Sequence, residues 1–104
     1  MLKKILCIVI TLNFTPVFGK IILIDPGHGG VENGAIGKKI KQGQLEKKLL
    51  EKEVSYKMAL KLKEKLSPYY QVYLTRSFDK TLSLEERSSL AQKLGADLFI
   101  SVHA

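Results

Sequence analysis

A short apolar run that breaks into a turn of proline and glycine constrains this chain more than any other stretch. Residues 21–24 are all branched aliphatics, and they lead directly into Asp25-Pro26-Gly27-His28-Gly29-Gly30. An uninterrupted apolar run is typical of a strand buried on both faces, as in a parallel sheet. Because proline cannot donate a ladder hydrogen bond, we expect the strand to end at Asp25 and to place His28 on a tight, exposed loop.

Two helices are predicted further along the chain. Between residues 50 and 66, apolar side chains recur at a spacing of four, with Ala59 beside them, which predicts a helix that packs on the core through Val54, Met58, Leu62 and Leu66. Ser83 and Glu86 have the spacing of a capping box. We expect the helix that they begin to continue through Leu94 and to end at Gly95.

Strands and helices alternate along the chain, which favours one fold class. The β-rich segments 71–75 and 97–102 are predicted as the second and third strands. Such alternation implies parallel strands with right-handed crossovers. We therefore predict an α/β fold, a three-layer sandwich with a mostly parallel sheet and helices on both faces. Residues 31–50, rich in glycine and lysine, are predicted to form a long loop.

The amino-terminal segment has the composition of a secretory signal peptide. Lys3 and Lys4 precede an apolar stretch that is too short to span a bilayer, and residues 17–19 resemble a cleavage site. We expect residues 1–19 to be this signal peptide and the remainder to be exported to the periplasm or the cell wall, with no stable membrane insertion after cleavage. The single cysteine, Cys7, lies in this segment, so metal ligands in the mature chain must be His, Asp or Glu.

Lysines between residues 38 and 48 supply much of the formal net charge of +7. A basic run of this kind is commonly a solvated face. The functional alternative is attraction to a polyanion, which for an exported protein means a polymer of the cell envelope. No aromatic residue interleaves with these lysines, so we expect no nucleic-acid partner. The composition indicates no particular oligomeric state.

Two histidines follow predicted strands in the same way. His28 follows the first strand and His103 the third, and the carboxyl ends of parallel strands lie at one edge of a sheet. Glu51, in the first turn of a helix, is expected on the same side. Two imidazoles and a carboxylate suit zinc and leave a fourth position for a water that the ion activates. Alternatively, the histidines are ordinary loop residues and Glu51 complements the helix dipole.

A series of motifs runs in order through residues 20–104. They are IDPGHGG (24–30), GAIG (34–37), EKEV (51–54) before ALKL (59–62), LTR (74–76) with Asp79, LSLEER (82–87) and ADLFISVHA (96–104). Together they closely resemble the zinc-dependent N-acetylmuramoyl-L-alanine amidases of the type-3 family. The resemblance implies hydrolysis of the amide between N-acetylmuramic acid and the L-alanine of the peptide stem, with peptidoglycan as substrate and zinc (Zn²⁺) as cofactor.

Carried over position by position, the resemblance implies that His28, Glu51 and His103 are the zinc ligands. Glu46 is a competing candidate, but Glu51 fits the spacing to the helix better. The family's catalytic general-base glutamate falls beyond Ala104, so no catalytic residue is assigned. We accordingly expect residues 20–104 to be the amino-terminal part of an amidase catalytic domain, truncated at its carboxyl end, with little activity as 104 residues alone.

Other residues at family positions have structural explanations. Buried pairing or turn formation explains Asp25 and Arg76, and Arg87 is expected to be a structural ion-pair partner. The segment between Gly37 and Glu51 is longer and richer in lysine than the family pattern. Two other functions remain open: a truncated, non-catalytic remnant that binds the envelope, and an exported zinc hydrolase that acts on another amide.

Overall fold

The computed structural model describes residues 19–43 and 45–104, so the predicted signal peptide lies outside the described residues except for Gly19. The helices and strands are β1 (Ile21–Pro26), β2 (Ile36–Gln42), β3 (Leu45–Leu50), α2 (Glu51–Leu66), β4 (Gln71–Leu74), α3 (Leu84–Leu94) and β5 (Leu98–Val102). Within the described ranges, no helix combines the length and the apolar character needed to cross a membrane.

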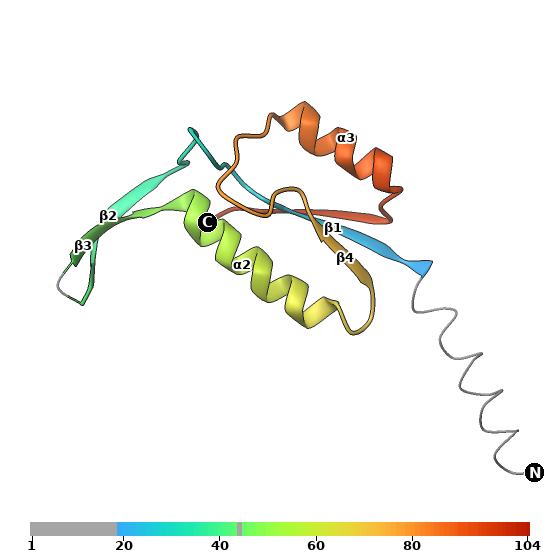
Figure 1. Ribbon diagram of the computed structural model, residues 1–104, viewed down its shortest axis with the longest axis horizontal. Helices are drawn as coiled ribbons and strands as arrows, with labels where there is room; N and C mark the ends of the chain where they lie inside the picture. The colour runs from blue at the N-terminus through green and yellow to red at the C-terminus, as the bar shows by residue number, and fades with distance from the viewer. Residues whose placement is uncertain (1–18, 44) are drawn as a thin grey trace, which may run out of the picture.

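A three-stranded sheet in the order β4-β1-β5 forms the centre of the molecule (Figure 1). Both neighbours run parallel to β1, which pairs Ile22 with Val72 of β4 and with Leu98 of β5. This arrangement confirms the predicted parallel α/β fold. The strand continues one residue beyond the predicted end, because Pro26 still pairs with Val102 of β5.

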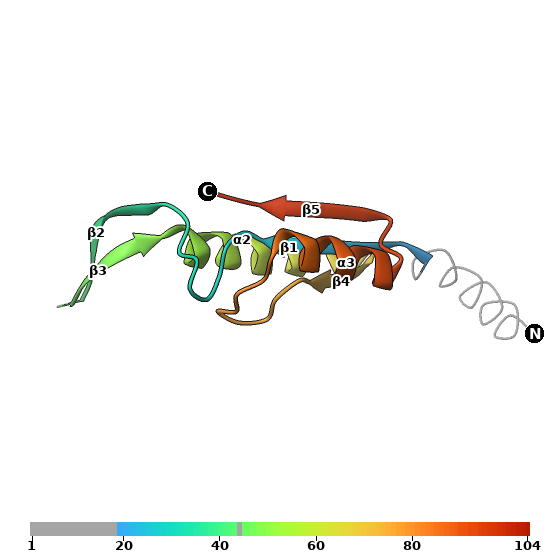
Figure 2. The same ribbon diagram turned by 90° about the horizontal axis from the view of Figure 1, so that it is seen from above.

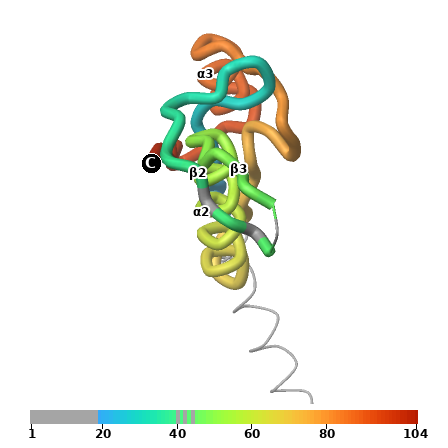
Figure 3. Tube along the Cα trace, turned by 90° about the vertical axis from the view of Figure 1, so that its left-hand side faces the viewer, coloured from blue at the N-terminus to red at the C-terminus, as the bar shows by residue number. Residues whose placement is uncertain are grey.

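Helices cover both faces of this sheet, as predicted. Ile22 and Ile24 of β1 form a buried cluster with Ala59 of α2 and Val72 of β4. The alternate residue Asp25 lies on the other face, where it contacts Arg87 of α3. Figure 3 shows α3 and α2 on opposite sides of the strands, so the layers are helix, sheet and helix.

The apolar stripe that α2 buries differs from the predicted one. Ala59, Leu62 and Leu66 belong to the core or pack against it as expected, but Met58 is 47% exposed and the unpredicted Ser55 is fully buried. A strict spacing of four advances about 40° around the helix at each step, so such a stripe leaves one face within three steps. The small side chains of Ser55 and Ala59 instead let the helix approach the sheet closely.

Helix α3 begins and ends where the sequence predicts. The Ser83 hydroxyl accepts from the Glu86 N–H at 3.0 Å, and the Glu86 carboxylate accepts from the Ser83 N–H, which completes the capping box. The helix ends at Gly95 in the left-handed conformation, with φ of 64°. Both signals are local, which is why the sequence alone reveals them.

The prediction of a loop over residues 31–50 was wrong for most of its length. Strands β2 and β3 form an antiparallel hairpin that extends beyond the end of the central sheet (Figure 2). Lys39 pairs with Lys48 and Lys41 with Glu46, and the register is irregular between Ile36 and Lys39. Because β3 is exposed along most of its length, no alternation of apolar and polar residues marks it as a strand.

Candidate functional site

The loop after β1 has an unusual backbone. His28 has a φ of 63°, and the following glycines also have positive φ values, of 127° at Gly29 and 59° at Gly30. Gly29 and Glu32 exchange two backbone hydrogen bonds, at 2.8 and 3.0 Å, which close the turn. A histidine in the left-handed region is uncommon and persists only where its surroundings fix it, so the conformation identifies this loop as a candidate site.

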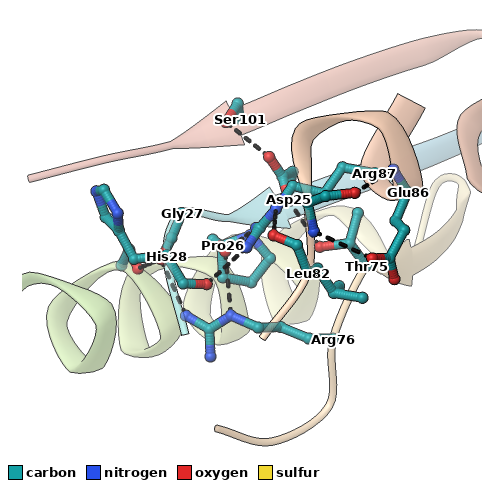
Figure 4. A network of polar contacts seen from close by, with 12 residues as sticks. Asp25, Pro26, Gly27, His28, Thr75, Arg76, Leu82, Glu86, Arg87 and Ser101 are labelled. Carbon is teal, nitrogen blue, oxygen red and sulfur yellow. Dashed lines mark hydrogen bonds and ion pairs between the residues drawn. The ribbon is translucent and has the colours of Figure 1, made fainter. Parts of the chain in front are cut away.

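Asp25, at the end of β1, is the buried centre of a polar network (Figure 4). Its carboxylate pairs with Arg87 of α3 at 2.7 Å, and both side chains are only 5% exposed. The hydroxyls of Thr75 and Ser101 donate to the same carboxylate at 2.8 Å each. The structure thus confirms the ion pair expected for Arg87 and the buried pairing expected for Asp25.

Two guanidinium groups hold the loop through its carbonyl oxygens. Arg87 donates to the carbonyls of His28 at 2.7 Å and Pro26 at 2.8 Å. Arg76 approaches from another direction and donates to Pro26 and Gly27 at 3.1 Å each. The two arginines thus satisfy the carbonyl oxygens at the end of β1 and in the loop that follows, and they fix the position of His28.

A second clamp joins the loop to α2 and to the segment before α3. Asp79 accepts from the Gly30 N–H at 2.7 Å and from Lys52 Nζ at 2.8 Å. Lys52 also donates to the Gly30 carbonyl at 2.9 Å. The hydrogen bond from Lys52, followed by the one from the Gly30 N–H, lowers the pKa of the Asp79 carboxyl from its ordinary value.

Glu51 begins α2 directly after the hairpin. The helix lacks a side-chain cap; instead the carbonyls of Ala35 and Asn33 accept from the N–H groups of Glu51 and Lys52, at 2.9 and 3.0 Å. The Ala35 N–H in turn donates to Glu51 Oε1 at 3.0 Å. The start of the helix is therefore held by the segment that leads into β2.

The carboxyl group of Glu51 is more acidic than that of an ordinary glutamate. The hydrogen bond from the Ala35 N–H is the main cause that lowers its pKa from 4.5 to about 2. The Ala104 N–H, the His103 imidazole and the nearby His28 act in the same direction, whereas desolvation opposes them. Glu51 therefore carries a negative charge at neutral pH.

The two histidines and Glu51 meet at one end of the central sheet. His28 Nε2 and His103 Nδ1 each lie 3.2 Å from Glu51 Oε2, and the two rings are nearly perpendicular, with centroids 5.1 Å apart. One donor atom from each residue lies within 4.8 Å of the others. The predicted juxtaposition is therefore present in the structure.

This donor set fits a zinc ion. Tetrahedral zinc with bonds of about 2.0–2.1 Å places its donors about 3.3 Å apart, close to the two imidazole–carboxylate distances of 3.2 Å. The side chains of His28 and His103 are 29% and 54% exposed, whereas Glu51 is 10% exposed. A ligand could therefore approach from the side of the histidines.

Glu46, the competing candidate, lies elsewhere. It is on the exposed hairpin opposite Lys41, and its carboxylate pairs with Lys39 at 3.7 Å. Glu51, and not Glu46, belongs to the cluster with the histidines.

Sequence reasoning missed two glycines that make room for the cluster. A Cβ atom at Gly34, where φ is 70°, would lie 2.5 Å from Cδ2 of His28 and 2.8 Å from Cβ of Glu51. A Cβ atom at Gly27 would lie 2.5 Å from Nδ1 of His103. Both glycines stand in the quoted motifs, but the need for space becomes apparent only once the distant side chains are in place.

Comparison with known proteins identifies relatives over most of the chain. A family model described as N-acetylmuramoyl-L-alanine amidase matches residues 22–104. The amidase LytC of Bacillus subtilis is 43% identical over 90 residues, which are 86% of this chain and 16% of LytC. The amidase AmiC of Escherichia coli O6:H1 is 40% identical over 86 residues, which are 81% of this chain and 19% of AmiC.

A solved structure with the same fold is the catalytic domain of CwlV, an N-acetylmuramoyl-L-alanine amidase from Bacillus (Paenibacillus) polymyxa var. colistinus. It superposes with a TM-score of 0.69 at 39% identity and covers 82% of this chain. The match corresponds to 45% of the CwlV domain. The chain thus spans less than half of that domain and under a fifth of the two curated relatives.

Proposed function

Because the chain belongs to the N-acetylmuramoyl-L-alanine amidase family, we propose that it forms part of a zinc-dependent enzyme that hydrolyses the amide between N-acetylmuramic acid and L-alanine in peptidoglycan. The convergence of His28, Glu51 and His103 carries this proposal, since such a donor set suits a hydrolytic metal with an open position. The amidase names of the relatives support peptidoglycan as the substrate.

We assign His28, Glu51 and His103 as the zinc ligands. Zinc bound there would polarise the amide carbonyl and activate water. Glu51 contributes a negative charge at neutral pH, because backbone hydrogen bonds, chiefly from Ala35, lower the pKa of its carboxyl. The other two ligands are imidazoles, which bind the metal in their neutral form.

Neighbouring residues orient these ligands. Ser101 Oγ lies 3.2 Å from His103 Nε2, the ring nitrogen that does not face Glu51. The same hydroxyl donates to Asp25, so the contact links His103 to the buried network. A hydrogen-bond partner on the second ring nitrogen fixes the tautomer and angle of a metal-binding histidine. We assign this positioning role to Ser101.

The proposed substrate places the protein in the cell envelope. We propose that residues 1–19 are removed and that the mature protein acts in the periplasm or the cell wall. Mass spectrometry of protein recovered from the envelope should then give a first residue near Lys20. Intact Met1 on a cytosolic protein would contradict export.

The ligand assignment is tested by metal analysis of the full-length protein. His28→Ala and His103→Ala should each abolish stoichiometric zinc, and Glu51→Ala should weaken zinc binding by about 100-fold or more. Glu46→Ala is the matched control and should bind zinc like the parent protein. Zinc loss in Glu46→Ala but not in Glu51→Ala would show that the wrong glutamate is assigned.

The reaction is tested on purified peptidoglycan. The zinc-loaded full-length protein should release stem peptides with a free amino group on L-alanine, and a chelator should stop the release until zinc is restored. Zinc binding without any release would favour a non-catalytic envelope-binding protein. Released fragments with other amino termini would favour a zinc hydrolase for another amide.

A further inference from the structure

The β2–β3 hairpin, residues 36–50, concentrates positive charge beside the candidate zinc site. Its five lysines and one glutamate leave a net charge of +4. The lysine side chains are exposed; they belong to Lys38, Lys39, Lys41, Lys47 and Lys48. We call residues 36–50 the lysine hairpin.

The fold itself gains little from these charges. Lys39 and Lys48 face each other across the ladder, and like charges in directly opposed positions destabilise a hairpin. Lys39 pairs with Glu46, and Lys47 pairs with Glu53 at 3.0 Å. No ion pair within the described ranges engages Lys38, Lys41 or Lys48. Three ammonium groups are thus available to an anion from outside.

The lysine hairpin also stands apart from the core. It forms a separate two-stranded sheet that extends beyond the end of the central sheet (Figures 1 and 2). Isolated two-stranded hairpins are only marginally stable in water. An anion bound between the lysine side chains would reduce their mutual repulsion and stabilise the lysine hairpin.

The base of the lysine hairpin adjoins the candidate site. Ile36 pairs with Leu50, and Leu50 immediately precedes Glu51. Lys48 lies three residues before Glu51, about 10 Å along an extended strand. A polymer that reaches the histidine–glutamate cluster is therefore within reach of these ammonium groups.

We propose that the lysine hairpin binds carboxylates of the peptide stems that neighbour the bond to be cleaved. The inference rests on the proposed function, because it takes the bound polymer to be peptidoglycan, whose peptide stems end in free carboxylates. Lysine ammonium groups suit this partner, since a point charge on a flexible side chain can pair with carboxylates in many orientations.

Binding to purified sacculi tests the proposal. The full-length protein is used without zinc so that hydrolysis cannot interfere, and binding is measured by co-sedimentation. Replacement of the three unpaired lysines should weaken binding about tenfold at low salt, an effect that high salt removes; the variant is Lys38→Gln, Lys41→Gln, Lys48→Gln. The corresponding triple Lys→Arg variant should bind like the parent.

The control removes the same charge from another surface. Helix α2 carries three exposed lysines at a spacing of four, and their replacement should leave binding within about twofold of the parent value; the control variant is Lys57→Gln, Lys61→Gln, Lys65→Gln. Equal weakening by the two triple variants would reduce the effect to net charge and overturn the proposal.

Modified sacculi identify the anion. Amidation of the carboxyl groups should lower binding of the parent protein to that of the hairpin variant, whereas removal of phosphate-containing polymers should not change it. We call the part of binding that the triple Lys→Gln variant of the hairpin loses hairpin-dependent binding. If it survives amidation, or if it disappears when the phosphate polymers are removed, the assignment of carboxylates as the ligand is wrong. Hairpin-dependent binding to vesicles of anionic phospholipid but not to sacculi would indicate a membrane partner instead.

The two proposals fail in different ways. Glu51→Gln should remove hydrolysis but keep the difference between the hairpin and control variants. If no preparation hydrolyses peptidoglycan while that difference persists, the amidase proposal is wrong and the lysine hairpin still binds peptide carboxylates. If hydrolysis occurs and the difference is absent, the hairpin proposal is wrong.

Discussion

At the scale of single residues, the site depends on a glycine, because His28 and Glu51 occupy the space that a side chain at position 34 would need. Gly34 adopts a left-handed backbone conformation, and an added methyl group there would overlap both His28 and Glu51. The hydrogen bond between the Ala35 N–H and Glu51 follows immediately in the chain. Gly34 therefore affects the positions of two of the three proposed ligands, although it offers no donor atom to the metal.

We predict that Gly34→Ala weakens zinc binding by about 10–100-fold, because the methyl group displaces the His28 ring and the Glu51 side chain. A competition titration with a chromophoric chelator measures the change. Gly43→Ala is the matched control: its φ of 64° imposes the same backbone strain, but nothing lies within 4 Å of its Cβ position. Equal zinc affinity in the two variants would contradict the clearance argument.

At the scale of elements, α3 acts on the site through one side chain. Arg87 reaches from α3 to Asp25 and to the His28 carbonyl, so α3 fixes the loop after β1 although the two are far apart in sequence. The guanidinium is almost completely buried, and the hydroxyls of Thr75 and Ser101, which also donate to the Asp25 carboxylate, carry no charge that could replace it. The capping box at Ser83 fixes where α3 begins, and Arg87 lies in the first turn that follows.

We predict that Arg87→Met lowers the free energy of unfolding by about 3–5 kcal/mol, since it leaves the buried Asp25 carboxylate without its ion-pair partner. Chemical denaturation of the metal-free protein measures this loss. The double variant Asp25→Asn, Arg87→Met should lose less than Arg87→Met alone, because it removes the uncompensated charge. A loss below about 1 kcal/mol in the single variant would mean that the ion pair is not important for stability.

The elements differ in how far their sequence reveals them. Helix α3 is predictable almost to the residue, because each of its ends is fixed by residues close in sequence. Ser83 and Glu86 form the capping box at its start, and the N–H of Gly95 donates to carbonyls of the last turn. Helix α2 has a visible apolar pattern, but its first N–H groups are satisfied by Ala35 and Asn33 of a distant loop. The lysine hairpin has no such signal, because its strands are held by ladder hydrogen bonds rather than by burial of alternate residues.

At the scale of the whole molecule, topology brings distant residues together. His28 and His103 follow β1 and β5, which are adjacent and parallel, so their proximity was predictable from strand order and direction. The supports of the site were not predictable in this way. Arg76 and Asp79 each hold the loop after β1 from about fifty residues away, and no local pattern specifies which carbonyl or N–H each one contacts.

Asp79 connects three parts of the molecule and makes their association dependent on pH. Its carboxylate joins the loop after β1, through the Gly30 N–H, to Lys52 of α2 and to the segment before α3. These contacts lower its pKa in the folded protein below the ordinary value of 3.8. A carboxyl whose folded-state pKa is depressed stabilises the fold above its ordinary pKa, and that contribution is lost as the pH falls toward the folded-state value.

We therefore predict that the unfolding temperature of metal-free Asp79→Asn falls less steeply than that of the parent protein as the pH is lowered through 3.8. Above that pH the variant should be the less stable of the two, because it lacks the charged partner of Lys52. Thermal unfolding followed by circular dichroism across the acid range measures both curves. Glu64→Gln, on the exposed face of α2, is the control and should follow the parent curve. If the Asp79→Asn and parent curves stay parallel through this range, the carboxylate does not couple the loop to α2 in the way that the hydrogen bonds indicate.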